Sequence, residues 1–91
     1  MLSGMEDRAP YDGVFKELGG RYRKWRLKRG LVQEDAMEYG FSVRHYQQLE
    51  AGRSHNLKTL FKLSNMLNVD PEDLIKGLVR TPTSKKNKNP K

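Results

Sequence analysis

The chain contains no cysteine, which excludes disulfide scaffolds, cysteine-ligated zinc sites and thiol catalysis. Its two histidines, His45 and His55, lie ten residues apart without the spacing of an HExxH zinc helix, so no histidine metal site is indicated. Apolar runs reach only two or three residues, too short to cross a membrane, and residues 1–13 lack the apolar stretch of a secretory signal. We therefore expect no metal or other cofactor, no membrane partner and a cytoplasmic location.

Positive charge is the strongest bias of the composition, but most of it lies in a short C-terminal segment. The 91-residue chain has a net charge of +7, of which residues 80–91 contribute +5 and the other 79 residues +2. Residues 21–33 hold six basic side chains and no acidic one, whereas residues 34–50 hold four acidic side chains and one arginine. A basic segment beside an acidic one suits a protein that presents one face to phosphates. From charge alone, a solvated helix face is the simpler explanation.

The ends of the chain differ in composition from its middle. Residues 1–13 contain two glycines and a proline without apolar periodicity, so we expect a flexible N-terminal arm. Residues 80–91 are polar, basic and proline-containing, which predicts a disordered tail. Residues 14–79 remain as a single domain. A core of that size buries only about 60% of the surface of the unfolded chain.

Apolar spacing predicts an all-α domain of five helices, since no segment alternates with a period of two residues. Glycine, serine, asparagine and aspartate are placed where helices need their caps. The first predicted helix runs through Phe15, Leu18, Tyr22 and Trp25 and ends at Gly30; a short helix over 33–39, stopped by Gly40, and a helix over 42–51, capped by Ser42, follow. The fourth helix runs from Asn56 to Asn68, and its inward-facing residues are predicted to be Leu57, Leu60, Phe61, Ser64 and Leu67. Asp70 and Pro71 begin the fifth helix.

The stretch from Ala36 to Leu49 carries the clearest functional signal. Ala36, Gly40, Tyr46 and Leu49 have the spacing that two helices need when they cross steeply through a short turn. The small residue lies at the crossing, the glycine at the turn and the two apolar residues on the inner face of the second helix. This spacing alone is compatible with a DNA-binding helix-turn-helix and with a plain helical hairpin.

The outer face of that second helix bears Val43, Arg44, Gln47 and Gln48. Arginine and glutamine are suited to bidentate recognition of guanine and adenine in the major groove, and valine can contact a thymine methyl group. The pattern is compatible with base recognition by this helix and with an outer face that is merely polar.

Several separated motifs resemble the phage repressor/Cro-type helix-turn-helix family, also called the XRE family. The resemblance covers residues 15–79 and rests on Leu18-Gly19-Gly20-Arg21-Tyr22-Arg23-Lys24-Trp25-Arg26, Gly30-Leu31, Gln33-Glu34-Asp35, Gly40-Phe41-Ser42, Leu49-Glu50-Ala51-Gly52, Thr59-Leu60, Leu67-Asn68-Val69 and Leu74. It implies a five-helix domain with 33–39 as scaffold helix and 42–51 as recognition helix. The chain departs from the family pattern between Leu31 and Gly40, where it is one residue shorter, with Asp35 at a usual leucine position and Val32 at the usual Ser/Thr cap.

The resemblance also implies roles for individual residues. Base contacts are expected from Val43, Arg44 and Gln48. Contacts to the DNA backbone are expected from Gln33, Ser42, Gln47, Arg53 and Lys58. The family pattern also pairs Arg26 with Glu50 as a structural ion pair rather than a DNA contact.

The expected function is sequence-specific binding to double-stranded DNA by a small transcriptional regulator, acting as a homodimer on a two-fold operator. Leu74 and Ile75 are expected to face the core, whereas Leu78 and Val79 continue the apolar face and are predicted to form the dimer seam. The alternatives are a protein-interaction adaptor or antitoxin-type partner with the same fold, and a non-specific nucleic-acid binder that acts through residues 80–91. An enzyme is not expected, since no nucleophile–base pair, metal set or phosphate-binding glycine loop is present.

Overall fold

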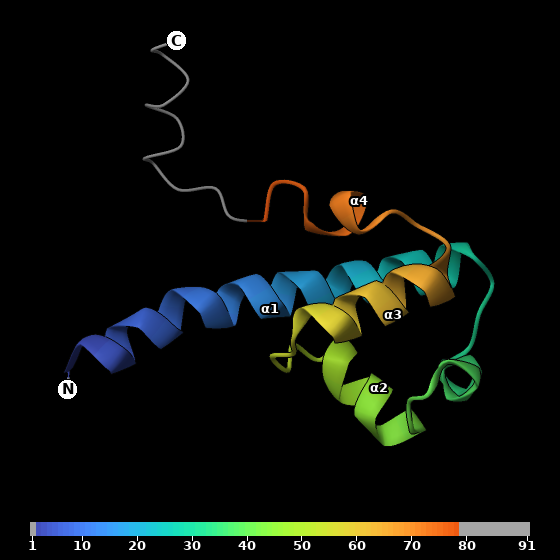
Figure 1. The fold of residues 1–91 in the computed structure, drawn as a ribbon, viewed down its shortest axis with the longest axis horizontal. Helices are drawn as coiled ribbons and strands as arrows, with labels where there is room; N and C mark the ends of the chain where they lie inside the picture. The colour runs from blue at the N-terminus through green and yellow to red at the C-terminus, as the bar shows by residue number, and fades with distance from the viewer. Residues whose placement is uncertain (1, 79–91) are drawn as a thin grey trace, which may run out of the picture.

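The computed structural model describes the backbone of residues 2–78 and the side chains of residues 13–78. This part of the chain forms five helices and no strand, as the sequence predicted (Figure 1). The helices are α1 (Leu2–Lys28), η1 (Gln33–Tyr39), α2 (Val43–Glu50), α3 (Leu57–Leu67) and α4 (Pro71–Ile75). The predicted tail over 80–91 lies outside the described residues, as does Val79.

The first helix is longer than predicted. The sequence predicted a loose arm over 1–13, whereas the backbone is helical from Leu2 onward. Lack of apolar periodicity shows only that a segment has no buried face. Extending an existing helix adds one hydrogen bond per residue without a new nucleation step, so a helix can continue past its packed part. In Figure 1 the N-terminal part of α1 projects beyond the body formed by the other helices.

Local capping chemistry sets the ends of α2 and α3 as the sequence predicted. The Ser42 hydroxyl accepts a hydrogen bond from the backbone N–H of His45 at 3.0 Å. The Asn56 side-chain oxygen accepts from the N–H of Thr59 at 2.9 Å. Asn68 ends α3 in the left-handed conformation with φ of 55°. Each side chain takes a backbone group that the helix itself leaves unpaired, so these ends are encoded locally.

The departure from the family pattern between Leu31 and Gly40 has a structural explanation. Residues of η1 form a 3₁₀ helix rather than an α-helix. A 3₁₀ helix rises about 2.0 Å per residue against about 1.5 Å in an α-helix, so fewer residues span the same length. The Asp35 carboxylate accepts the backbone N–H of Val32 at 2.8 Å. Asp35 therefore caps the helix start, which explains a charged residue at a usual leucine position.

The core lies where α1, α2 and α3 meet. Its largest fully buried side chains are Tyr22, Tyr46, Leu49, Leu63, Leu67 and Leu74. The predicted inner face of α3 was partly wrong, because Leu57 and Phe61 are exposed while Leu63 and Met66 are buried. The buried stripe of α3 runs through positions 60, 63 and 67, the i, i+3, i+7 spacing of one helix face.

The end of the domain also differs from the prediction. Ile75 was expected in the core but is exposed, and Leu78 was expected at a dimer seam but is buried within the protomer. The reason is that α4 ends after five residues and the chain turns at Gly77, which has φ of +74°. Leu78 therefore no longer follows the helical register of α4. Its side chain joins the core, so Leu78 cannot form the predicted seam.

Two arginines of the basic segment connect α1 to the ends of other helices. The guanidinium of Arg21 donates to the carbonyls of Leu74 and Lys76 at 2.9 and 2.6 Å. That of Arg29 donates to the carbonyls of Leu67 and Asn68, both at 2.8 Å. Cations at helix C-termini satisfy free carbonyls and oppose the negative end of the helix dipole. A large share of the charge in residues 21–33 is therefore structural.

Candidate nucleic-acid interface

The outer face of α2 is a shallow hollow lined by the side chains that were predicted to meet bases. Its lining consists of Val43, Arg44, Gln47, Gln48 and Ala51. The opposite face of α2 carries Tyr46 and Leu49, which are fully buried. The five side chains of the hollow thus lie fully or partly exposed, while two apolar side chains fix the helix to the core. This helix can present its polar face to a partner without exposing its packed side.

Arg44 is the least restrained of these residues. Its side chain is exposed and forms no hydrogen bond or ion pair with the described residues. Val43 is partly buried beside it at the start of α2. Ser42 is exposed, but its hydroxyl already caps the helix. Arg44 therefore retains all five N–H donors of its guanidinium for a ligand.

Gln33 and Gln47 join η1 to α2 rather than lying separately on the surface. The side-chain amide of Gln47 donates to Gln33 Oε1 at 3.0 Å, and the amide of Gln33 donates to Glu50 Oε1 at 3.2 Å. Together they form a chain of polar contacts that leads from the exposed edge of α2 to a buried carboxylate. These hydrogen bonds hold η1 and α2 at a fixed spacing. They are made by two of the residues that were predicted to contact the DNA backbone.

The Arg26–Glu50 ion pair predicted from the resemblance is present. Arg26 Nε lies 2.7 Å from Glu50 Oε2, and the two side chains are 10% and 7% exposed. Arg26 also donates to the carbonyl of Leu31 at 3.1 Å. The hydrogen bond to Glu50 raises the pKa of Arg26, while burial raises the pKa of the neighbouring Tyr46. The pair therefore fixes the C-terminal end of α2 against α1.

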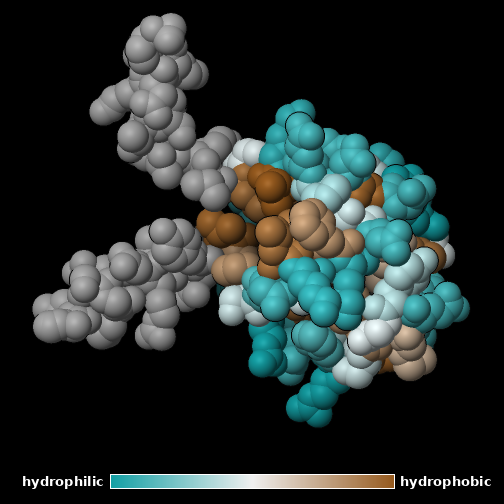
Figure 2. Space-filling model, viewed as in Figure 1, coloured by the Kyte–Doolittle hydropathy of each residue, from teal (hydrophilic) through white to brown (hydrophobic). Residues whose placement is uncertain are grey.

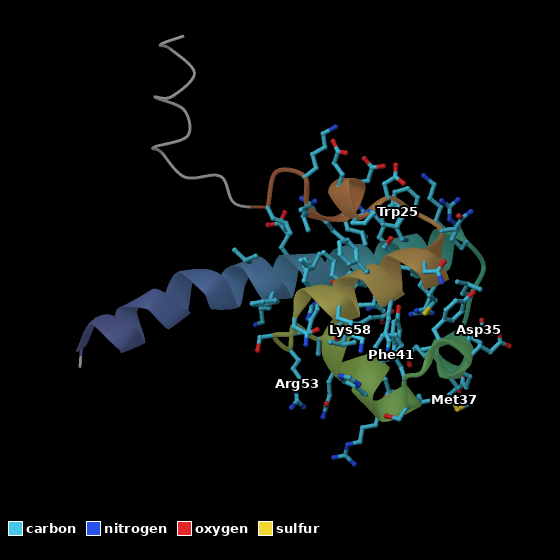
Figure 3. All side chains as sticks on the ribbon, viewed as in Figure 1. Trp25, Asp35, Met37, Phe41, Arg53 and Lys58 are labelled. Carbon is cyan, nitrogen blue, oxygen red and sulfur yellow. The ribbon has the colours of Figure 1, made fainter. Side chains whose placement is uncertain are left out.

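Arg53 and Lys58 lie around the connection between α2 and α3, where Figure 3 labels both. Both side chains are exposed. Lys58 stands in the first turn of α3, whereas Arg53 reaches back and donates from Nη1 to Gln48 Oε1 at 2.6 Å. This contact could not be predicted from the sequence, because it joins two long polar side chains whose rotamers depend on their surroundings.

His55 packs between aromatic rings. Its ring centroid lies 5.3 Å from that of Phe15 and 5.5 Å from that of Tyr22. The ring Nδ1 is 2.9 Å from the carbonyl oxygen of Arg53, and Nε2 is 2.7 Å from the Tyr22 hydroxyl. A carbonyl can only accept, so in the neutral ring Nδ1 donates and Nε2 accepts from Tyr22. Burial lowers the pKa of His55 and so favours this neutral form.

The described residues contain no group of three or more His, Cys, Asp or Glu side chains that could hold a metal ion. None of the described helices has the length and apolar composition needed to cross a bilayer. What the surface does offer is an amphipathic helix with a free arginine, fixed to a second short helix through a glycine turn at Gly40. This is the geometry of a helix-turn-helix.

Comparison with known proteins agrees with this geometry. Residues 23–74, more than half of the chain, match the family described as Helix-turn-helix. This chain belongs to the XRE-type helix-turn-helix family. The helix-turn-helix protein is also 38% identical over 61 residues to the SPbeta prophage-derived uncharacterized HTH-type transcriptional regulator YonR of Bacillus subtilis (strain 168). That alignment covers 65% of this chain and 56% of the relative, so the chain spans little more than half of the relative's length. No solved structure matches the chain.

Proposed function

We propose that this protein is a transcriptional regulator that binds double-stranded DNA sequence-specifically in the cytoplasm, with α2 in the major groove. The observation that carries the proposal is the unpaired Arg44 on the exposed hollow of α2. An α-helix of eight residues is about 12 Å long, and the major groove is about 12 Å wide. The family and its named relative support the same assignment.

Three residues of α2 would each contact a different base. Arg44 has the donors for a bidentate contact to the O6 and N7 atoms of guanine. Val43 offers methyl groups to thymine at the start of the helix. Gln48 lies one helical turn beyond Arg44 on the same hollow and reaches a second base pair.

Contacts to phosphates would surround this reading face. Arg53 and Lys58 supply positive charge at the α2–α3 connection, where their exposed side chains stand beside the C-terminal end of α2. Gln33 and Gln47 supply amide groups at the junction of η1 and α2, close to exposed Ser42. Such contacts fix the register of the protein on the duplex without reading its sequence.

Replacing Arg44 by alanine is expected to relax preference at one base pair of each half-site, at a cost of about 1–3 kcal/mol. Selection of bound sites from random duplex DNA, followed by titration of the selected site, measures both effects. Lys24→Ala removes one exposed positive charge from α1 and serves as control, because Lys24 does not line the hollow. Equal base preferences for the wild type and Arg44→Ala would contradict the role of Arg44.

We propose further that the regulator acts as a homodimer on a two-fold operator. With Leu78 buried, the candidate seam moves to the apolar side chains that remain exposed on α3 and α4, namely Leu57, Phe61 and Ile75. Figure 2 shows apolar surface gathered in the left part of the body on the face that it draws. In Figure 1, α4 lies on the opposite side of α1 from α2, so this surface leaves the reading face uncovered. Burying such side chains between two copies is favourable by about 25 cal/mol per Å².

Phe61→Asp is expected to abolish self-association and to weaken operator binding, because it places a charge in the apolar contact. Sedimentation equilibrium measures the first effect and titration of a palindromic site the second. Phe61 is 51% exposed, so its replacement should leave the melting temperature of the protomer nearly unchanged. Met37→Asp, at a residue 56% exposed on η1, is the matched control. A Phe61→Asp variant that associates as the wild type does would place the seam elsewhere.

A further inference from the structure

The base-reading glutamine of α2 is held by a residue outside the helix. Arg53 Nη1 donates to Gln48 Oε1 at 2.6 Å, and the backbone N–H of Arg53 donates to the Gln48 carbonyl at 3.0 Å. Main chain and side chain of Arg53 therefore fix the same residue. Gln48 is partly buried on the hollow of α2, so its amide keeps only part of its freedom before any ligand arrives.

The segment that carries Arg53 is itself anchored to the core. The Arg53 carbonyl accepts from His55 Nδ1, and His55 Nε2 is bonded to the hydroxyl of fully buried Tyr22. Gly52, just before Arg53, has φ of +107° and packs so closely on Lys16 that a Cβ atom would lie 2.8 Å from its Cγ. These contacts hold the backbone of Arg53 in place, so its side chain reaches Gln48 from a backbone whose position is fixed.

The contact decides which half of the amide remains available. A glutamine that reads adenine bidentately accepts from N6 through its oxygen and donates to N7 through its nitrogen. Here the oxygen is occupied by a cation, and a second donor approaching it would meet the positive charge of Arg53. The free group is the Nε2 amide, which can only donate. Guanine presents two acceptors, N7 and O6, at the same edge of the major groove.

We propose that Arg53 is a positioning residue that sets the base preference of Gln48, turning it from an adenine reader into a donor that selects guanine. The proposal rests on the proposed function, because it presumes that α2 lies in the major groove. It assigns Arg53 a role in sequence recognition beyond the phosphate contact expected of an exposed loop arginine.

The test is selection of bound sites from random duplex DNA with the full chain and three variants. Gln48→Ala identifies the base pair that Gln48 reads, as the position whose preference disappears. We expect guanine at that position for the wild type. Arg53→Met, which keeps the length of the side chain but removes its donors, is expected to lower the guanine-to-adenine ratio there by tenfold or more and to leave other positions unchanged. Lys58→Met is the matched control, since it removes an exposed charge that contacts no base reader.

The possible results separate the inference from the function on which it rests. If Arg53→Met weakens all sites alike and the ratio stays the same, as expected for Lys58→Met, Arg53 is only a phosphate contact and the inference is wrong. Adenine or thymine at this position in the wild type would also overturn it. A wild type that enriches no sequence would overturn the proposed function itself. A thermal melt of Arg53→Met that matches the wild type shows that the comparison is made between folded proteins.

Discussion

Arg26→Ala is expected to lower the free energy of unfolding by about 3–5 kcal/mol, the cost of breaking a buried ion pair by removing one partner. The variant would leave the Glu50 carboxylate, only 7% exposed, without its cation. The amide of Gln33 would remain as its hydrogen-bond donor, at 3.2 Å. The carbonyl of Leu31 would also lose the donor that Arg26 provides. An amide cannot balance a buried negative charge, so most of the cost should remain.

Chemical denaturation of the wild type and Arg26→Ala measures this change. Arg23→Ala is the matched control, because Arg23 is an exposed arginine on the same helix and should change stability by less than about 0.5 kcal/mol. Arg26→Met combined with Glu50→Leu should be less destabilised than Arg26→Ala, since the double variant leaves no charge unpaired. If Arg26→Ala were as stable as Arg23→Ala, the pair would contribute nothing to the fold.

Gly19→Ala is expected to destabilise the domain by at least about 1–3 kcal/mol, the range for an overpacked core. A Cβ atom at this position would lie 2.5 Å from the Glu50 carbonyl oxygen and 2.6 Å from that of Leu49. Both atoms belong to the backbone at the end of α2, so no side-chain rotation can relieve the contact. The helix must move instead, and with it the reading face and the buried ion pair.

Gly20, the next residue, supplies a control whose replacement by alanine should change stability in the opposite direction. Apart from its chain neighbours and the nearby backbone of α1, no described atom lies within 4 Å of a Cβ built on Gly20, which is also helical and exposed. Gly20→Ala should therefore raise stability by about 0.5–1 kcal/mol, the helix preference of alanine over glycine. Thermal melts and operator titrations of the two variants make the comparison. Equal effects of the two substitutions would show that α1 and α2 do not meet closely at Gly19.

Much of the fold could be predicted because its signals are local. The caps Ser42 and Asn56 act on backbone groups within the next three residues, so their positions predict the helix starts directly. The burial of Leu78 could not be predicted in this way. Its burial depends on where α4 ends and on the turn at Gly77, which are set by packing against the rest of the domain. The apolar periodicity predicted a longer α4, in which Leu78 would lie on the surface.

The candidate site was predictable in its residues but not in their connections. The spacing of α2 identified Arg44 and Gln48 as residues of the outer face, because an amphipathic helix has only one such face. The partner of Gln48, by contrast, depends on the rotamer of Arg53, and long polar side chains have many rotamers in reach. The same holds for Arg29, for which the sequence indicated only a positive charge and whose guanidinium caps α3.

The bonds from Arg21 to the carbonyls of Leu74 and Lys76 span 53 and 55 residues of sequence. During synthesis Arg21 is made well before the two carbonyls to which it donates. At about 5–20 residues per second, this gap lasts about 3–11 s. For that time the guanidinium of Arg21 has neither of these two carbonyls to bind within the nascent protein. The contact between α1 and the end of α4 therefore forms only after residue 76 has been made, later than the packing of α1 on α2 and α3 can begin.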